Sequence, residues 1–449
     1  MTLVEQRPAS GPPREWRFPA FERRRLDSGL HLILCHLPGR PMTAARVVLE
    51  AGAATEPAGQ GGLAALAARS LSEGTEALDA HAFAEATEAL GAEVRGEVSW
   101  DAMHVRLDVP AGRLAPALAL LADVVRRPGF RPAEVERVRT ERLDQLAQEK
   151  VDPSALAGKS FSRAVFVPDA AYARPLQGTE ASVGGLDRDA IAEFYAGRLS
   201  SATLIVVGDL SGVDGPKLAE PLFGSWDVDG APAVSPVVDE AGGGRRIVLV
   251  DRPGSVQSAL SIGHAGPRRA IPDYVPVGTM AMVLGGVFGS RLNMKLREEK
   301  GYTYGAQAGF DFRRHGGAFA ARSAVRTEDT AAAVADAVGE IVRTHAEGIP
   351  EDELAPVREY RVGVYPIAYE RPASIAMGLA DLVTHGLPDG WFDRMRAEIA
   401  GVSAEDVSAA AAARLRPDDL AIVVVGDAER IRGELEATGL GPVHDTPAP

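Results

Sequence analysis

Two segments of the chain share one pattern of apolar and polar positions. Residues 30–52 contain two alternating apolar and polar runs separated by Pro38-Gly39, and residues 245–266 repeat this plan around Pro253-Gly254. A period of two that is interrupted by a turn dipeptide is typical of neighbouring strands. Each segment therefore predicts a pair of strands joined by a turn.

A second pair of segments repeats at nearly the same distance along the chain. Residues 200–212 and residues 417–430 each contain a buried-type apolar run that ends in Gly-Asp, with Gly208 and Gly426 in equivalent places. Self-similarity at a fixed long period indicates a duplicated unit. We therefore predict two homologous domains.

Each half mixes helical and strand patterns. In the first half we predict helices at 62–72, 81–90, 114–126 and 132–150, and strands at 93–97 and 103–109. This order favours two α+β domains that face each other, each a mainly antiparallel sheet with packed helices, over an alternating parallel sheet. The predicted organisation is an N-terminal extension at 1–25, a first domain at 26–226, a linker at 227–246, a second domain at 247–435 and a tail at 436–449.

Composition narrows the possible partners. The chain has 449 residues, of which 46% are apolar and 24% charged, and this length suits two or more domains. The net charge is −14 and the basic cluster at 21–25 is small, so we expect no nucleic-acid partner. The apolar runs are far shorter than the ~20 residues that span a bilayer, so we expect no membrane partner. The absence of an apolar leader and the single Cys35 predict a cytoplasmic protein.

The segment 285–306, GGVFGSRLNMKLREEKGYTYGA, carries the most specific motif. Ser290 is a plausible N-cap for a short helix through Glu299, and Gly301 can adopt the left-handed conformation that ends a helix. A strand would then begin at Tyr302. The motif combines a glycine-rich turn, an Arg and a Tyr seven residues later, at Gly285, Gly286, Gly289, Ser290, Arg297 and Tyr304.

The helix end and the turn can bring Arg297 and Tyr304 to one surface, where a guanidinium and a phenol could donate hydrogen bonds to a peptide carbonyl or carboxylate. A simpler interpretation competes with this one. From Tyr302 onward the residues alternate as in a half-buried strand, which would make Tyr304 a core tyrosine. Arg297 would then be an ordinary surface charge at a helix end.

The motif resembles the C-terminal half of the M16 (pitrilysin/insulinase) metallopeptidase family, and the two-half plan extends the resemblance over nearly the whole chain. The resemblance is to non-catalytic subunits of bacterial two-chain peptidases and to alpha-type subunits of mitochondrial processing peptidases. It implies that the two domains form half of a clam-shell chamber. It also implies that Arg297 and Tyr304 hold a substrate backbone near a zinc ion on the opposite domain.

The zinc motif of the catalytic members of this family is degenerate in this chain. They carry His-x-x-Glu-His on a helix just before Gly-Thr, where two histidines bind zinc and the glutamate activates water. The corresponding positions here are Ala65, Ala68 and Arg69, in register with Gly74-Thr75. Ala and Arg cannot bind zinc. The family's third ligand has no unambiguous counterpart among Glu141, Asp144 and Glu149.

No other catalytic or metal motif is evident in the sequence. His31 and His36 flank Cys35, but strand alternation places the two histidines on opposite faces, so a shared metal is not expected. G-x-S-x-G, P-loop and Rossmann motifs are absent. We therefore expect this chain to bind no metal or other cofactor itself.

Two functions of different kinds are compatible with these features. In the first, the chain is a substrate-binding subunit that pairs with a His-x-x-Glu-His homologue, which would supply the zinc, and completes its active site for peptide hydrolysis. In the second, it is an inert scaffold that keeps only the fold, like the core subunits of a respiratory complex. Retention of both Arg297 and Tyr304 favours the first, because a scaffold needs neither.

Overall fold

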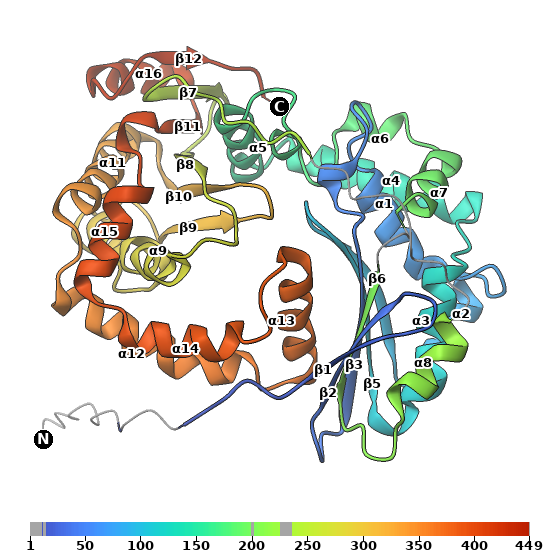
Figure 1. Ribbon diagram of the computed structural model, residues 1–449. Coiled ribbons are helices and arrows are strands. Elements are labelled where there is room, and N and C mark those ends of the chain that lie inside the picture. Colours follow the sequence, from blue (N-terminus) through green and yellow to red (C-terminus); the bar gives the residue numbers. More distant parts are fainter. Residues whose placement is uncertain (1–10, 12–14, 199–201, 225–235, 449) are drawn as a thin grey trace, which may run out of the picture.

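The structure is a computed structural model that describes residues 11, 15–198, 202–224 and 236–448. It contains two six-stranded sheets, one in each half of the chain (Figure 1). The first sheet has the order β1-β2-β6-β3-β5-β4 and the second the order β12-β7-β11-β8-β10-β9. The strands of the first are β1 (Glu22–Arg25), β2 (His31–His36), β3 (Met42–Leu49), β4 (Glu93–Val98), β5 (Met103–Pro110) and β6 (Ala202–Gly208). Those of the second are β7 (Arg246–Asp251), β8 (Gln257–Gly266), β9 (Ala306–Phe312), β10 (Gly317–Arg326), β11 (Ala421–Gly426) and β12 (Val443–Asp445).

Strands β2–β6 of the first sheet and β7–β11 of the second have the same topology, whereas β1 pairs antiparallel with β2 and β12 pairs parallel with β7. β2 pairs parallel with β6, as β7 does with β11, while β3, β5 and β4 pair antiparallel in the same order as β8, β10 and β9. The predicted duplication and the α+β class are confirmed. The sheets also extend beyond the boundaries predicted from sequence, because β1 lies in the predicted extension and β12 in the predicted tail.

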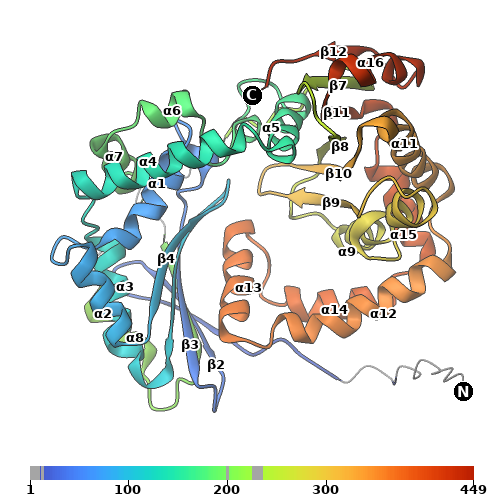
Figure 2. The ribbon, with the colours of Figure 1, turned by 180° about the vertical axis from the view of Figure 1, so that it is seen from behind.

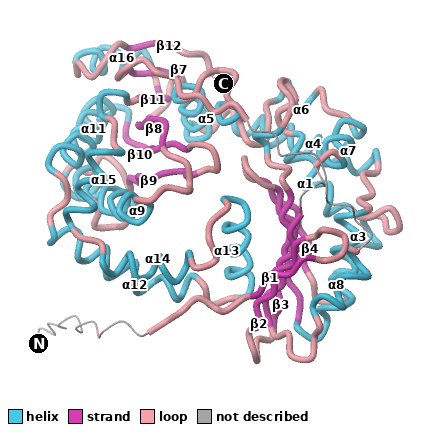
Figure 3. The backbone as a smooth tube through the Cα atoms, viewed as in Figure 1, coloured by secondary structure: helices cyan, strands magenta, loops and turns pink. Residues whose placement is uncertain are grey.

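One face of each sheet is covered by helices of its own half (Figures 1 and 3). In the first half these are α1 (Leu63–Ser70), α2 (Ala80–Ala89), α3 (Leu114–Arg126), α4 (Pro132–Glu149), α7 (Arg188–Ala196) and α8 (Gly215–Phe223), with the short α6 (Glu180–Gly184) beside α4. In the second half α9 (Tyr274–Ala281), α11 (Thr330–Glu347) and α16 (Ala428–Ala437) pack on the strands, while α12 (Glu351–Ala368), α14 (Trp391–Gly401) and α15 (Ala404–Arg414) pack on α9.

The opposite faces are covered by an exchange of helices between the halves. α5 (Pro153–Val165), from the first half, packs on β8 and β11 of the second sheet, whereas α13 (Pro372–His385), from the second half, packs on β3 and β6 of the first. Figure 2 shows α13 against the first sheet and α5 above the second. The apolar side chains Ile33, Ile205 and Val207 therefore join the core of the second half.

The elements predicted in the first half agree closely with the structure. The helix predicted at 62–72 is α1 followed by a 3-10 turn over Leu71–Glu73, and Gly74 ends it with φ 105°. Leu114–Arg126 forms a helix over the predicted residues, and Pro132 is the first residue of α4. Residues 227–235 of the predicted linker lie outside the described part of the chain.

The helical segment Tyr274–Glu299, which a turn at residues 287–290 interrupts, contains the first part of the motif segment. It is the one helix among the described residues that is long and apolar enough to cross a membrane by composition alone. Its apolar side chains, including Met280, Leu284 and Leu292, are buried in the core of the second half. Packing in that core accounts for its composition.

Candidate functional site

The motif segment winds more loosely than the predicted short α-helix. α9 continues into the π-helix η5 (Met282–Gly286), and after a turn α10 (Arg291–Asn293) continues into the π-helix η6 (Met294–Glu299). Ser290 lies at the predicted N-cap position, but its hydroxyl accepts a hydrogen bond from the Asn293 side-chain amide (3.2 Å) and caps no backbone N–H. π-turns are frequent at functional sites.

The glycine-rich turn has one glycine that packing requires. A Cβ on Gly285 would lie 2.3 Å from the backbone nitrogen of Ala308, so only glycine lets η5 approach β9 this closely. A Cβ on Gly286 would meet the Met282 side chain at 2.9 Å, whereas Gly289 faces open space. Gly285 therefore sets the distance between the motif helix and the edge strand β9.

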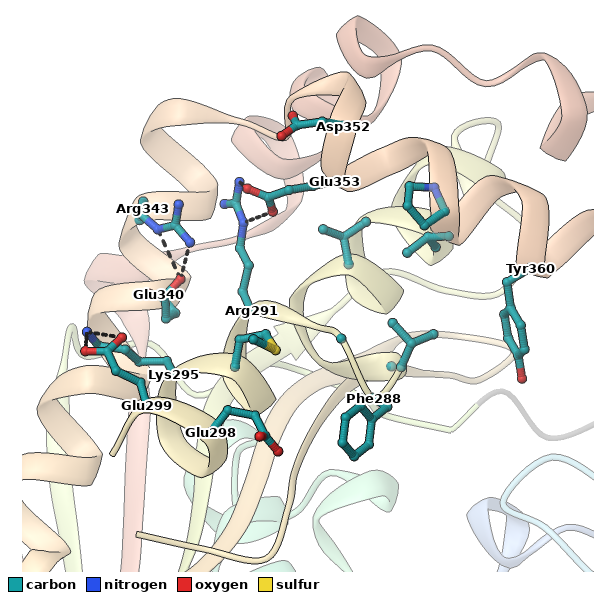
Figure 4. Close-up of a pocket in the computed structure, with 17 residues that line it drawn as sticks. Phe288, Arg291, Lys295, Glu298, Glu299, Glu340, Arg343, Asp352, Glu353 and Tyr360 are labelled. Atoms are coloured by element: carbon teal, nitrogen blue, oxygen red, sulfur yellow. Dashed lines mark hydrogen bonds and ion pairs between the residues drawn. The ribbon is translucent and has the colours of Figure 1, made fainter. Parts of the chain in front are cut away.

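Arg291 of the Ser-Arg-Leu triplet is a structural anchor that the sequence did not identify. Its guanidinium is buried and donates to both carboxylate oxygens of Glu353 (2.6 and 3.1 Å) and to Gly348 O (2.9 Å). Figure 4 shows Arg291 reaching from the motif helix to Glu353 at the back of an outer groove of about 1250 Å³. The guanidinium also donates to the Thr344 hydroxyl of α11 (2.9 Å), so this buried charge with three partners ties α10 to both α11 and α12.

The strand predicted from Tyr302 begins later, at Ala306. Gly301 has the predicted left-handed conformation, with φ 66°. After it, the Thr303 hydroxyl donates to Gly305 O (2.9 Å) and the Ser323 hydroxyl of β10 also donates to Gly305 O (3.0 Å). These bonds hold residues 302–305 in a turn, because side-chain hydroxyls compete with the sheet for backbone groups.

Tyr304 projects from this turn into solvent. Its relative exposure is 93%, so the interpretation of Tyr304 as a core tyrosine is wrong. Its phenol forms no hydrogen bond with any of the residues that the structure describes. A rigid turn thus presents a tyrosine that has no packing role, and its hydroxyl is available to a ligand.

Arg297 lies at the end of the same motif helix and is half-buried. Its Nε lies 3.4 Å from Glu298 Oε1, and its guanidinium carbon lies 4.6 Å from the centre of the Phe288 ring. Cation–π contact with Phe288 restrains the guanidinium, while its two Nη groups form no hydrogen bond with a described residue and can donate to a ligand. Arg297 lines a pocket with Gly305 and Ala306, the two residues that follow Tyr304. No hydrogen bond joins Arg297 to Tyr304 in the described structure.

The degenerate zinc positions lie on α1, opposite α4. Ala65 and Ala68 are buried, and the Arg69 guanidinium donates to Gln145 (3.0 Å) and Glu141 (3.2 Å) of α4. The Arg69 guanidinium thus occupies the space between the two helices. Two alanines and an arginine offer no ligand for zinc at these positions. Gln145, one helical turn from Glu141, was not identified from the sequence because its contact with residue 69 is long-range.

The other candidate ligands do not assemble into a metal site. Glu149 accepts one hydrogen bond from Arg142 and pairs with Lys159, both at 2.7 Å, and Asp144 is exposed on α4. His31 and His36 are exposed at opposite ends of β2, and burial raises the pKa of Cys35 between them to about 12. Within the described ranges, no three His, Cys, Asp or Glu side chains are grouped in a way that could hold a metal ion.

A buried carboxylate caps the degenerate zinc helix. Glu56 Oε1 accepts hydrogen bonds from the backbone N–H groups of Gly62 (3.1 Å) and Ala64 (2.8 Å) at the start of α1. Burial raises the pKa of Glu56 to about 7, against the opposing effect of these amides and of Arg174. The carboxylate is therefore costly to ionise in the folded state.

Replacing Glu56 with Gln should stabilise the protein at pH 8 and change little at pH 5. The raised pKa means that the folded state binds more protons than the unfolded state between about pH 4.5 and 7, so stability falls as the pH rises through this window. Gln keeps the accepting oxygen and removes the ionisation, for a gain of about 1–3 kcal/mol at pH 8. Thermal unfolding of both proteins at the two pH values measures this, and an equal shift at both would contradict it.

Comparison with known proteins places this architecture in a family. Residues 32–169 match the family model described as insulinase (peptidase family M16), and residues 185–360 match the model described as peptidase M16 inactive domain. The two matches contain most strands of both sheets, and they include both the degenerate zinc positions and the Arg297–Tyr304 motif.

Some curated relatives are named as proteases, and one is named as a non-peptidase. An uncharacterized zinc protease of Mycobacterium tuberculosis is 28% identical over 53% of this chain and 55% of its own length, so the chain spans about half the length of that relative. The non-peptidase homolog YmxG of Helicobacter pylori is 23% identical over 87% of this chain and 90% of its own length.

Solved structures share the fold over almost the whole chain. A peptidase M16 inactive domain from Pseudomonas fluorescens superposes with a TM-score of 0.84 at 24% identity, covering 90% of this chain and 98% of its own. A protease from Helicobacter pylori gives a TM-score of 0.82 at 17% identity, covering 91% and 99%. With Ala65, Ala68 and Arg69 at the zinc positions, the chain belongs to the M16 (insulinase) peptidase family as an inactive member.

Proposed function

We propose that this chain is the non-catalytic, substrate-binding subunit of a two-chain zinc peptidase. A partner of the same family with an intact His-x-x-Glu-His motif would supply the zinc and the general base. This chain would supply Arg297 and Tyr304 as hydrogen-bond donors to the backbone of a peptide, together with half of the enclosing chamber. Peptide hydrolysis would then require both chains.

The single observation that carries this proposal is the exposure of Tyr304 on a rigid turn. Hydrogen bonds from Thr303 and Ser323 fix the turn, while the Tyr304 ring is 93% exposed and contributes nothing to the core. Arg297 is restrained by Phe288 beside it. Hydrogen-bond donors that are already in position need no rearrangement when a ligand binds, and such donors favour both binding and transition-state stabilisation.

Loss of the metal site supports the assignment of zinc binding to the partner and of peptide binding to this chain. Arg69 bridges α1 and α4 where a catalytic member needs two histidines and an acid, so this chain has no means of activating water there. A scaffold would account for this loss equally well. It would not account for an exposed tyrosine and a restrained arginine at the family's spacing.

Co-expression with a partner tests the proposal. The partner is a homologue of similar length from the same genome that carries His-x-x-Glu-His. We expect the two chains to co-elute in size-exclusion chromatography and to cleave a quenched peptide library. This chain alone should contain no stoichiometric zinc and cleave no peptide. The outcome against the proposal is a partner that is fully active alone and gains nothing from this chain.

A further inference from the structure

A second pocket adjoins the candidate site on the face of the second sheet that α5 covers. It has a volume of about 430 Å³ and is lined by Arg297 of the motif helix, Arg322 of β10, and residues of α5, β8 and β9. Arg322 pairs with Gln307 of β9 on one side and with Ser261 of β8 on the other. The pocket therefore begins directly beside the turn that carries Tyr304.

The walls of this pocket are basic and neutral in an otherwise acidic protein. Its lining contains two guanidinium groups and no carboxylate. The remaining polar groups are neutral, and they belong to Ser154, Ser261, Asn293, Gln307 and Ser323. The chain as a whole has a net charge of −14. This cavity, lined by two guanidinium groups and no carboxylate, is therefore positively charged in a negatively charged protein.

Arg322 has no ion-pair partner among the described residues. Although it is accessible to solvent, the walls of the pocket remove part of its hydration and lower the pKa of its guanidinium, with Asp311 acting in the opposite direction. Asp311 is itself engaged with Arg313, at 2.7 Å. A partly desolvated cation without a partner gains from any anion that reaches it.

We infer that this pocket binds a carboxylate of the peptide and that Arg322 determines a preference for acidic peptides. The inference rests on the proposed function, because Arg297 and Tyr304 would hold the peptide backbone at the mouth of the pocket. The carboxylate belongs to either an Asp or Glu side chain or the C-terminus of the peptide. Either source offers the two oxygens that a guanidinium fork binds.

Fluorescence anisotropy of this chain with labelled ten-residue peptides tests the inference without a partner. The peptides differ only in one internal Glu or Gln, and each is made with a free or an amidated C-terminus. We expect the carboxylate-bearing peptide to bind roughly tenfold more tightly or better than its neutral counterpart. The internal pair and the terminal pair identify which carboxylate is bound.

Arg322→Met should abolish this discrimination, and Arg322→Lys should retain part of it. The matched control is Arg326→Met in the same strand, where the native guanidinium is already paired with Asp329 (2.6 Å) and does not line the pocket. Because the Arg322 guanidinium forms no hydrogen bond or ion pair with a described residue, replacing it should leave the thermal unfolding midpoint unchanged. This readout separates lost binding from lost folding.

Equal affinities for acidic and neutral peptides would overturn the inference, as would unchanged discrimination in Arg322→Met. If the reconstituted pair is active in that case, the proposed function stands and only the carboxylate preference falls. If no peptide binds and no partner restores activity, the proposed function falls and the inference falls with it.

Discussion

Tyr304→Phe should reduce the kcat of the reconstituted peptidase by on the order of 10²–10³ at most, the range measured for removing one donor to a developing oxyanion. The substitution deletes a single hydroxyl. Because the ring is 93% exposed and forms no hydrogen bond with a described residue, Phe should fold and assemble as Tyr does. If the phenol binds mainly the ground state, the loss will appear in KM and be smaller.

The measurement is kcat and KM of the pair with each variant, after chromatography confirms assembly. Tyr360→Phe is the matched control, since Tyr360 is also an exposed tyrosine of the second half but belongs to α12, where it lines the outer groove. The control should keep full activity. A Tyr304→Phe pair that assembles and keeps full activity would show that the motif is only a fold signature, and the scaffold interpretation would then be preferred.

Asp101→Ala should strongly destabilise the junction of the two halves, with a loss of about 3 kcal/mol. Asp101 is buried in the β4–β5 turn, where it accepts hydrogen bonds from the Tyr172 hydroxyl (2.6 Å) and from the backbone N–H of Arg314 (2.9 Å) in the β9–β10 turn. Alanine leaves both donors buried without a partner, and each costs about 1–3 kcal/mol.

The same turns carry a stacked pair that reports on the junction. The Arg313 guanidinium carbon lies 3.6 Å from the centre of the Trp100 ring, so Trp100 fluorescence follows the separation of the halves. Urea unfolding by fluorescence and by circular dichroism measures the loss, and two separated transitions are expected in the variant. The control is Asp189→Ala, since Asp189 is exposed on α7 and pairs with its sequence neighbour Arg188, away from the junction. An equal effect of the two substitutions would contradict this role of Asp101.

The sequence by itself determined the duplication, the α+β class and most of the local elements. Period-two alternation and the glycine and proline positions are local signals, and they located α3, the start of α4 and the left-handed Gly301. The absence of histidines at positions 65 and 69 is also evident from the sequence, because zinc binding at these positions requires imidazole side chains.

Only the tertiary structure decided how these elements combine. The exchange of α5 and α13 depends on which sheet face each helix covers, and the apolar periodicity of a helix is the same on either sheet. The contacts of Arg69 with α4 and of Arg291 with α12 join residues more than fifty positions apart. Tyr304 alternates like a core residue, yet hydroxyls of Thr303 and Ser323 hold its segment out of the sheet. Side-chain competition for backbone hydrogen bonds, and not hydrophobic pattern, exposes the residue on which the proposed function depends.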